Sequence, residues 1–318
     1  ENRGLACMFT MMNNARLAVG LQGVGIAERA LQKASSYALE RTQGRAPGAE
    51  GAGMSPIVEH PDVKRMLLTM RGLTHAARSI AYACAIAIDR AETMEGEAAR
   101  FWQGRADLLT PIAKAFSTDV GVEVASLGVQ VHGGAGYVEE TGAAQFLRDA
   151  RIFPIYEGTN GIQAIDLVMR KLPLGEGQVV AAWIGELSAE AERVRGANDR
   201  ALGTVGERLV EAVTDLEAAA AWLATSRAEG RVSEALAGAT PFLRLCGLTA
   251  GGVALARAAL VSLTDPAVSG TPAAARRLLV AKAFATGPLS ATAGLRREIE
   301  DGGEAIASAP SELVAALL

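Results

Sequence analysis

Aromatic residues make up only 4% of this sequence of 318 residues, and cysteine occurs three times. The cysteines Cys7, Cys84 and Cys246 lie far apart and in apolar surroundings. An odd, scattered set argues against a disulfide framework and against a zinc site. We therefore interpret the cysteines as small buried apolar residues of a protein in a reducing, cytoplasmic compartment, and we expect no metal centre.

The sequence also lacks long hydrophobic runs. No run reaches the roughly 18 uncharged apolar residues that a membrane-spanning helix needs, and Arg257 interrupts the most apolar segment, residues 248–263. No signal-peptide pattern is present. We thus expect no membrane span. The sequence begins at Glu1 in what reads as the middle of a motif, so we expect a fragment or a processed piece of a longer chain.

A basic excess, which nucleic-acid binding usually requires, is missing too. The formal net charge is −4. Residues 1–172 carry 18 basic and 18 acidic side chains, and residues 173–318 carry 13 and 17. Neither half has the charge of a nucleic-acid-binding domain, so we expect no nucleic-acid partner.

Helix-forming residues dominate what is present, because alanine and leucine are abundant and β-branched runs are short. Apolar residues from Leu17 to Leu31 follow a 3.6-residue period, which predicts a helix that begins at Asn13 or Asn14 and ends near Thr42. Further helices are predicted over residues 61–93, 97–130 and 159–171, with Pro111 splitting or kinking the third. Residues 44–60 read as a loop. The predicted fold is all-α, with a four-helix up-and-down bundle over residues 1–172.

The second part of the chain is predicted to be a helical extension. Residues 173–182 read as a linker, and residues 183–318 show helical periodicity with no chemical motif. Its core is predicted to contain these apolar residues: Trp183, Leu187, Val194, Leu209, Val213, Leu216, Trp222 and Leu223.

A single carboxylate stands out in the segment Tyr156-Glu157-Gly158-Thr159. Thr159 or Asn160 is a plausible N-cap of the next helix, and Gly158 lets the backbone or a substrate approach closely. The neighbouring residues are apolar, and a carboxylate in such surroundings suits a general base. The alternative is that Glu157 solvates or caps the start of a helix. The residue types alone leave both readings open.

Three motifs in this order resemble the C-terminal domain of the flavin-dependent acyl-CoA dehydrogenase family. They are residues 130–137 (QVHGGAGY), residues 148–151 (RDAR) and residues 155–160 (IYEGTN). The resemblance covers residues 1–172, and the remainder resembles the helical tail of the family's longer members. It implies α,β-dehydrogenation of an acyl-CoA thioester, FAD as cofactor, and Glu157 as the base that removes the α proton.

The resemblance also implies a set of FAD-binding residues. Arg41 corresponds to the arginine that reaches the FAD pyrophosphate held mainly by a neighbouring subunit, although Gly44 replaces the usual aromatic three positions later. Gln130, Gly133 and Gly134 correspond to the clamp on the adenine side. A helix C-cap is the competing reading for Gly133. Thr159 is expected both to cap its helix and to reach the flavin.

Substrate contacts follow from the same resemblance. Arg16 is expected to bind the CoA part of the thioester, with Asn13 in place of the family's usual acid. Tyr156 and Gly158 are expected to line the substrate site beside Glu157. The charged residues Arg148, Asp149 and Arg151 are interpreted as an ion-pair network that holds Glu157 in place.

Two other functions stay open from the sequence. An acyl-CoA oxidase would use the same base and pass its electrons to oxygen. A non-catalytic helical or DNA-associated relative would need a basic stripe or a lost base, and the sequence shows neither. For the dehydrogenase we expect an electron-transfer-flavoprotein-type acceptor and a homodimer or tetramer. We expect the isolated chain to bind FAD poorly and to turn over no substrate.

Overall fold

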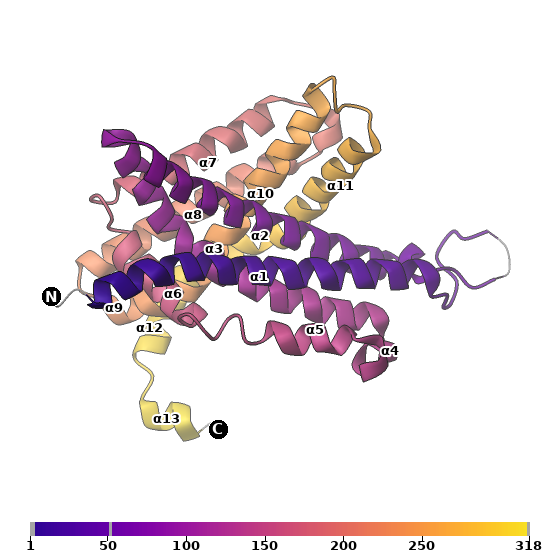
Figure 1. Ribbon diagram of the computed structural model, residues 1–318, viewed down its shortest axis with the longest axis horizontal. Coiled ribbons are helices and arrows are strands. Elements are labelled where there is room, and N and C mark those ends of the chain that lie inside the picture. Colours follow the sequence, from indigo (N-terminus) through magenta and orange to yellow (C-terminus); the bar gives the residue numbers. More distant parts are fainter. Residues whose placement is uncertain (1–3, 51–52, 317–318) are drawn as a thin grey trace.

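Three long helices in an up-down-up order form the first part of this computed structural model, which describes residues 4–50 and 53–316. They are α1 (Gly4–Glu40), α2 (Pro61–Thr93) and α3 (Gly96–His132). Figure 1 shows all three along the long axis of the molecule, with the connection between α1 and α2 protruding at one end. The predicted N-cap at Asn13 or Asn14 is wrong, because both residues lie inside α1.

Pro111 does not split the third helix. It is buried within α3, which continues without a break to His132. Gly133 ends α3 with φ 59° and ψ −141°, a backbone conformation open to glycine and costly for other residues. The competing reading of Gly133 as a helix C-cap is therefore confirmed.

The predicted fourth helix over residues 159–171 is present, as an α-helix that passes directly into a π-helical turn. The chain after α3 folds into several small elements, which are α4 (Gly134–Tyr137), the 3₁₀ turn η2 (Glu139–Thr141), α5 (Ala143–Ala150), α6 (Asn160–Asp166) and a π-helical turn η3 (Leu167–Lys171). The α-helical part is thus two turns long and widens into the π turn. The bundle receives its further long helix from α10, which packs on α2 and α3.

The second part of the chain is helical, as predicted. Its helices are α7 (Gln178–Gly196), α8 (Val205–Ala228), α9 (Val232–Ala237), α10 (Ala239–Thr264), α11 (Pro272–Thr286), α12 (Thr292–Ala307) and α13 (Ser311–Ala316). Two short 3₁₀ turns, η4 (Arg200–Leu202) and η5 (Pro288–Ala291), separate neighbouring helices. All the predicted core residues of this part are buried except Trp222, which is half-buried.

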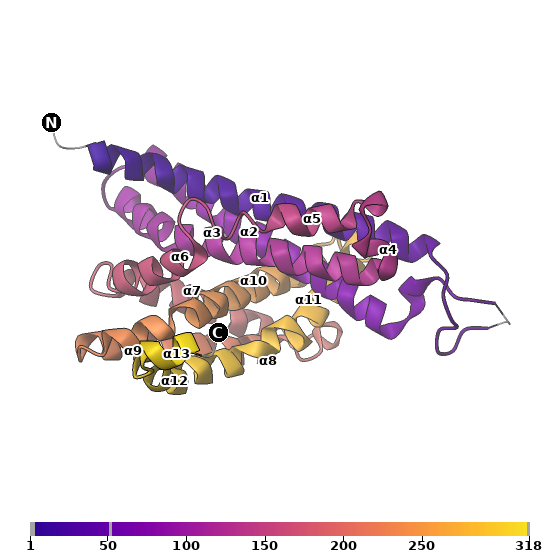
Figure 2. The same ribbon diagram turned by 90° about the horizontal axis from the view of Figure 1, so that it is seen from below.

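Both parts of the chain share one hydrophobic core. Figure 2 shows α10 and α11 against α2 and α3, on the side away from α1 and α5. The contact depends on small residues: a Cβ at Gly247 of α10 would lie 2.2 Å from the ring of Phe116 in α3, and one at Gly251 would lie 2.5 Å from Ala76 in α2. Glycine therefore lets α10 approach closely.

Two helical stretches are apolar enough to cross a membrane by length and composition, although none was expected. One is α10, of whose most apolar window 72% is buried in the fold. The other, Pro272–Ala307, is 33% buried and consists of α11 and α12 joined by η5. Burial of α10 against α2 and α3 identifies it as a core helix.

The described cysteines are buried thiols. Cys84 contacts the Thr110 hydroxyl at 3.6 Å, and burial raises its pKa to about 11. Cys246 is also buried, and burial raises its pKa strongly. The side chain of Cys7 lies outside the described part of the structure. Within that part, no group of three histidine, cysteine or acidic side chains is arranged to hold a metal.

Replacing Gly247 by alanine is expected to lower the free energy of unfolding by about 1–3 kcal/mol, because the added methyl group collides with the buried ring of Phe116. Gly185→Ala is the matched control, since no atom lies within 4 Å of the position of its Cβ. That control should stabilise the exposed helix by about 0.5–1 kcal/mol. Chemical denaturation measures both. Equal effects at the two positions would contradict the close contact.

Candidate functional site

Glu157 lies in the loop between α5 and α6, half-buried, with a left-handed backbone (φ 55°). Gly158 follows with φ 86°. A left-handed conformation is uncommon for a residue with a side chain and costs roughly 1–2 kcal/mol, so it persists only where the surroundings impose it. Among the described residues the carboxylate of Glu157 has no hydrogen-bond or ion-pair partner.

A buried lysine from α3 fixes this loop. Lys114 is 0% exposed, and its Nζ donates to the backbone oxygen of Gly158 at 2.9 Å and to Oδ1 of Asn160 at 2.8 Å. Hydrogen bonds in which the donor is charged are stronger than those between neutral groups. The ammonium group therefore ties the residue after Glu157 and the first residue of α6 to the middle of α3.

Asn160 completes the attachment of α6 to α3. Its side-chain amide donates to Oδ1 of Asp119 at 2.7 Å, to Oγ1 of Thr118 at 2.9 Å and to the backbone oxygen of Ala115 at 3.2 Å. Burial raises the pKa of Asp119, and the hydrogen bond from Asn160 opposes that rise. Polar groups on one face of α3 therefore hold the loop in place.

The residues expected to bind substrate come together at this loop. Arg16 of α1 donates to Oδ1 of Asn13 at 3.1 Å, and its guanidinium lies 3.9 Å from where a Cβ of Gly158 would be. The hydroxyl of Tyr156 donates to Oε1 of Gln22 on the same helix. One cation and one aromatic side chain therefore flank the backbone around Glu157.

The charges of neighbouring groups affect the pKa of Lys114. The pKa of Lys114 is lowered to about 8, because burial and the charge of Arg16 together outweigh the opposing charges of Asp119 and Glu157. The Lys114 amine is therefore more easily deprotonated than an exposed lysine, and the Glu157 carboxylate is close enough to influence it.

A second group of predicted residues lines an open cavity of about 460 Å³ at the other end of the bundle. Arg41 enters it from the segment after α1, and Gln130, Gly133 and Gly134 enter it from the end of α3. The Arg41 guanidinium donates to Oε1 of Gln43 at 3.0 Å and remains exposed. This end offers an always-charged guanidinium and an accessible glycine turn, which together suit an anionic ligand.

His132 supports the wall of this cavity. Its ring stacks on Tyr37 at 4.4 Å between centroids, and its Nδ1 lies 2.7 Å from the backbone oxygen of Gly128. Burial lowers the pKa of His132, although that contact opposes the shift. The ring is a packing element at the end of α3.

Thr159, the remaining residue expected at the flavin, lies at the Glu157 end. Its hydroxyl accepts a hydrogen bond from the backbone N–H of Ile162 at 3.4 Å and caps α6. Arg16 and Arg41 are 25 residues apart on or just beyond α1, which corresponds to roughly 37 Å along a helix. One chain therefore carries two separate groups of candidate residues.

The proposed ion-pair network before the loop is wrong. Arg148 pairs with Glu139 at 2.8 Å, and Asp149 accepts a hydrogen bond from Gln145 at 3.4 Å. Both contacts are local and exposed. They stabilise the segment around α5, and the restraint on Glu157 comes from Lys114.

Sequence reasoning missed Lys114 and Asn160 as parts of the site. Lys114 is the one charged residue between Asp107 and Asp119, within an otherwise apolar helical segment. A lysine in the middle of such a segment needs partners if it is buried, and this was the signal that could have identified it.

The wild-type protein should gain stability relative to Lys114→Met as pH rises from about 8 to 10.5. Between these values the folded amine has lost its proton and the unfolded amine keeps it, so unfolding takes up a proton. Urea unfolding at several pH values measures the difference, with the exposed Lys64→Met as control. A variant with the wild-type pH dependence would contradict the burial of a titrating Lys114.

Comparisons with known proteins identify the family of this chain. A family profile described as "Acyl-CoA dehydrogenase, C-terminal domain" matches residues 2–172, and one described as "Acetyl-CoA dehydrogenase C-terminal like" matches residues 180–310. The chain is 43% identical, over 97% of its length, to a 3-methylmercaptopropionyl-CoA dehydrogenase of Ruegeria pomeroyi, of which it covers 52%. It is 31% identical, over 59% of its length, to a butyryl-CoA dehydrogenase of Syntrophomonas wolfei, of which it covers 31%.

Solved structures show the same fold. A Bacillus anthracis acyl-CoA dehydrogenase complexed with FAD matches 99% of this chain with a TM-score of 0.73 at 20% identity, and the match covers 52% of that protein. Caenorhabditis elegans ACDH-11 in complex with C11-CoA matches 94% of this chain with a TM-score of 0.70 at 20% identity, covering 48% of that protein. The chain thus spans about half the length of these proteins or less. Because the first profile matches more than half of its residues, the chain belongs to the acyl-CoA dehydrogenase family.

Proposed function

We propose that this chain is the C-terminal part of an FAD-dependent acyl-CoA dehydrogenase and that Glu157 removes the α proton of the thioester. The observation that carries the proposal is the imposed left-handed backbone at Glu157, beside Arg16 and above Lys114. A carboxylate without a partner among the described residues is free to accept a proton. Family membership supports the reaction class.

The residues around Glu157 have different roles in the proposed reaction. Lys114 and Asn160 hold the loop, so that the position of the Glu157 carboxylate is set before a substrate arrives. Arg16 offers a cation to the CoA part of the thioester. Tyr156 and Gly158 flank the base and form the surface on which the acyl chain lies. When bound, FAD supplies the acceptor for the hydride that leaves the β carbon.

FAD fits the residues at the two ends of the bundle. Arg41 would hold the pyrophosphate, and Gln130, Gly133 and Gly134 would hold the adenine side, because the cavity they line is open and carries the exposed guanidinium of Arg41. Thr159 would approach the isoalloxazine ring at the Glu157 end. The bacillary relative of the same fold is complexed with FAD.

The roughly 37 Å between these ends supports a homodimer or a tetramer. An extended FAD is shorter than this distance, so a single flavin would meet Arg41 of one copy and Thr159 of another. The acceptor for its electrons would be an electron-transfer flavoprotein. The buried, free thiols of Cys84 and Cys246 fit a reducing, cytoplasmic compartment.

We infer that the substrate is a thioester with a short acyl chain. Two relatives carry names that specify 3-methylmercaptopropionyl-CoA and butyryl-CoA, and these acyl groups are similar in length. Turnover of both thioesters compared with a palmitoyl thioester would test this inference.

Glu157→Gln in the complete enzyme is expected to lower kcat roughly 10²–10⁴-fold while FAD content and thioester affinity stay at wild-type values. Glu176→Gln is a close control, because Glu176 also has a left-handed backbone (φ 58°) but lies in an exposed turn before α7. Reduction of the flavin under anaerobic conditions measures the chemical step. Wild-type turnover in the Glu157 variant would exclude it as the base.

Arg41→Gln in the complete enzyme is expected to weaken FAD binding about tenfold, because a charge-assisted hydrogen bond is lost. Arg45→Gln serves as control, since Arg45 belongs to the same connecting segment and donates to the backbone oxygen of Ala49. Flavin release on dilution measures the affinity. If both variants retained FAD equally, Arg41 would have no part in the flavin site.

A further inference from the structure

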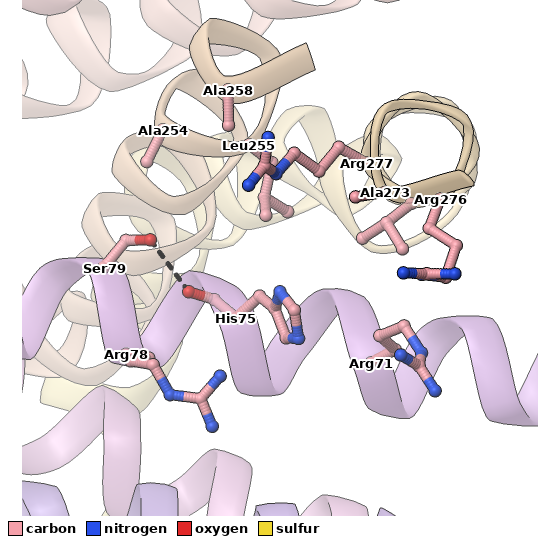
Figure 3. A pocket seen from close by; sticks show the side chains of 11 residues that line it. Arg71, His75, Arg78, Ser79, Ala254, Leu255, Ala258, Ala273, Arg276 and Arg277 are labelled. Atoms are coloured by element: carbon pink, nitrogen blue, oxygen red, sulfur yellow. Dashed lines mark hydrogen bonds between the residues drawn. The ribbon is translucent and has the colours of Figure 1, made fainter. Parts of the chain in front are cut away.

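A basic cavity of about 310 Å³ lies between α2, α10 and α11. Figure 3 shows Arg71, His75 and Arg78 along one face of α2, with Arg276 of α11 reaching toward Arg71 and Arg277 of α11 extending toward α10. The positive end of the α11 dipole adds to the charge of these side chains. None of the residues assigned above to the flavin or the thioester lines this cavity.

The positive charge in this cavity is only partly compensated. Arg78 pairs with Glu28 of α1 at 2.6 Å, and its guanidinium points toward that helix. Arg277 donates to the neutral hydroxyl of Ser262 at 3.2 Å. Among the described residues Arg71 and Arg276 have no carboxylate partner. The guanidinium groups of Arg71 and Arg276 therefore line the cavity without an anion of their own.

His75 lies within the same excess of positive charge. Burial lowers its pKa, the charges of Arg78 and then Arg71 lower it further, and Glu28 alone opposes them. Like charges held in one cavity repel one another and destabilise the folded state unless an anion joins them. Because Arg276 and Arg277 are exposed, water screens part of this repulsion, and a bound anion would relieve the remainder.

The remaining wall of the cavity is apolar. Ala254, Leu255 and Ala258 of α10 form most of it, and Val280 of α11 continues it. The volume lies near the lower end of the range for small-molecule sites. A ligand with an anionic group and a compact organic part would contact the guanidinium groups and the apolar wall at the same time.

We propose that this cavity binds a small phosphate monoester, with Arg71 and Arg276 on the phosphate and the α10 wall against the organic part. A phosphate dianion matches two uncompensated guanidinium groups better than a single carboxylate does, and guanidinium groups bind phosphate oxygens in pairs. The site is separate from the Glu157 loop, because α11 packs on α10 and α2, whereas α5 packs on α1 and α3.

Isothermal titration of the full-length protein with inorganic phosphate and with adenosine 5′-monophosphate at low ionic strength tests the proposal. Both ligands should bind saturably, and the monophosphate should bind more tightly if its base lies on the apolar wall. In the double variant Arg71→Gln/Arg276→Gln the affinity should fall about tenfold for each guanidinium removed. Arg100→Gln/Arg297→Gln removes the same charge from exposed positions outside the cavity and should bind as the wild type does.

Two further arms separate the alternatives. Octanoate offers a carboxylate on an apolar chain, and a short DNA duplex offers phosphodiesters. Equal losses in the two double variants would mean that net charge, not this cavity, governs binding, and would overturn the proposal. So would binding of octanoate or of the duplex alone, or no saturable binding of either phosphate. The readout is independent of Glu157 and of flavin content.

Discussion

The buried ammonium group of Lys114 is the interaction on which the candidate active site depends. It bridges the middle of α3, the backbone oxygen of Gly158 and the side chain of Asn160, and so joins two segments more than forty residues apart. Burying a charge is costly unless it is well hydrogen-bonded, and here both acceptors are fixed by the fold. That arrangement keeps the unusual backbone of Glu157 in place.

Much of the fold could be predicted because it follows local rules. The apolar spacing from Leu17 to Leu31 marks α1, and the proline at position 61 marks the start of α2. The residues of the Arg41 cavity could be named from motifs. Their meeting follows from the up-down-up order of the first three helices, which makes α1 and α3 parallel and places the end of α1 beside the end of α3.

The parts that could not be predicted depend on tertiary contacts. Nothing in the sequence near Asn160 shows that α6 stops at Asp166 and continues as a π turn. The left-handed backbone of Glu157 is imposed from α3, so residue preferences alone do not reveal it. Charge pairing in residues 148–151 looked plausible by spacing, yet the nearest acceptor for Arg148 came from η2.

The packing of α10 into α2 and α3 has a consequence for shorter relatives. A chain that ended at Leu172 would leave Ala76, Gly72 and the ring of Phe116 facing water, since these are the residues that α10 and α11 cover. Such a large apolar surface favours aggregation or association. A protein without the extension would therefore have to bury this face against another subunit or replace it with polar side chains. The extension therefore buries this apolar face of the bundle within the same chain.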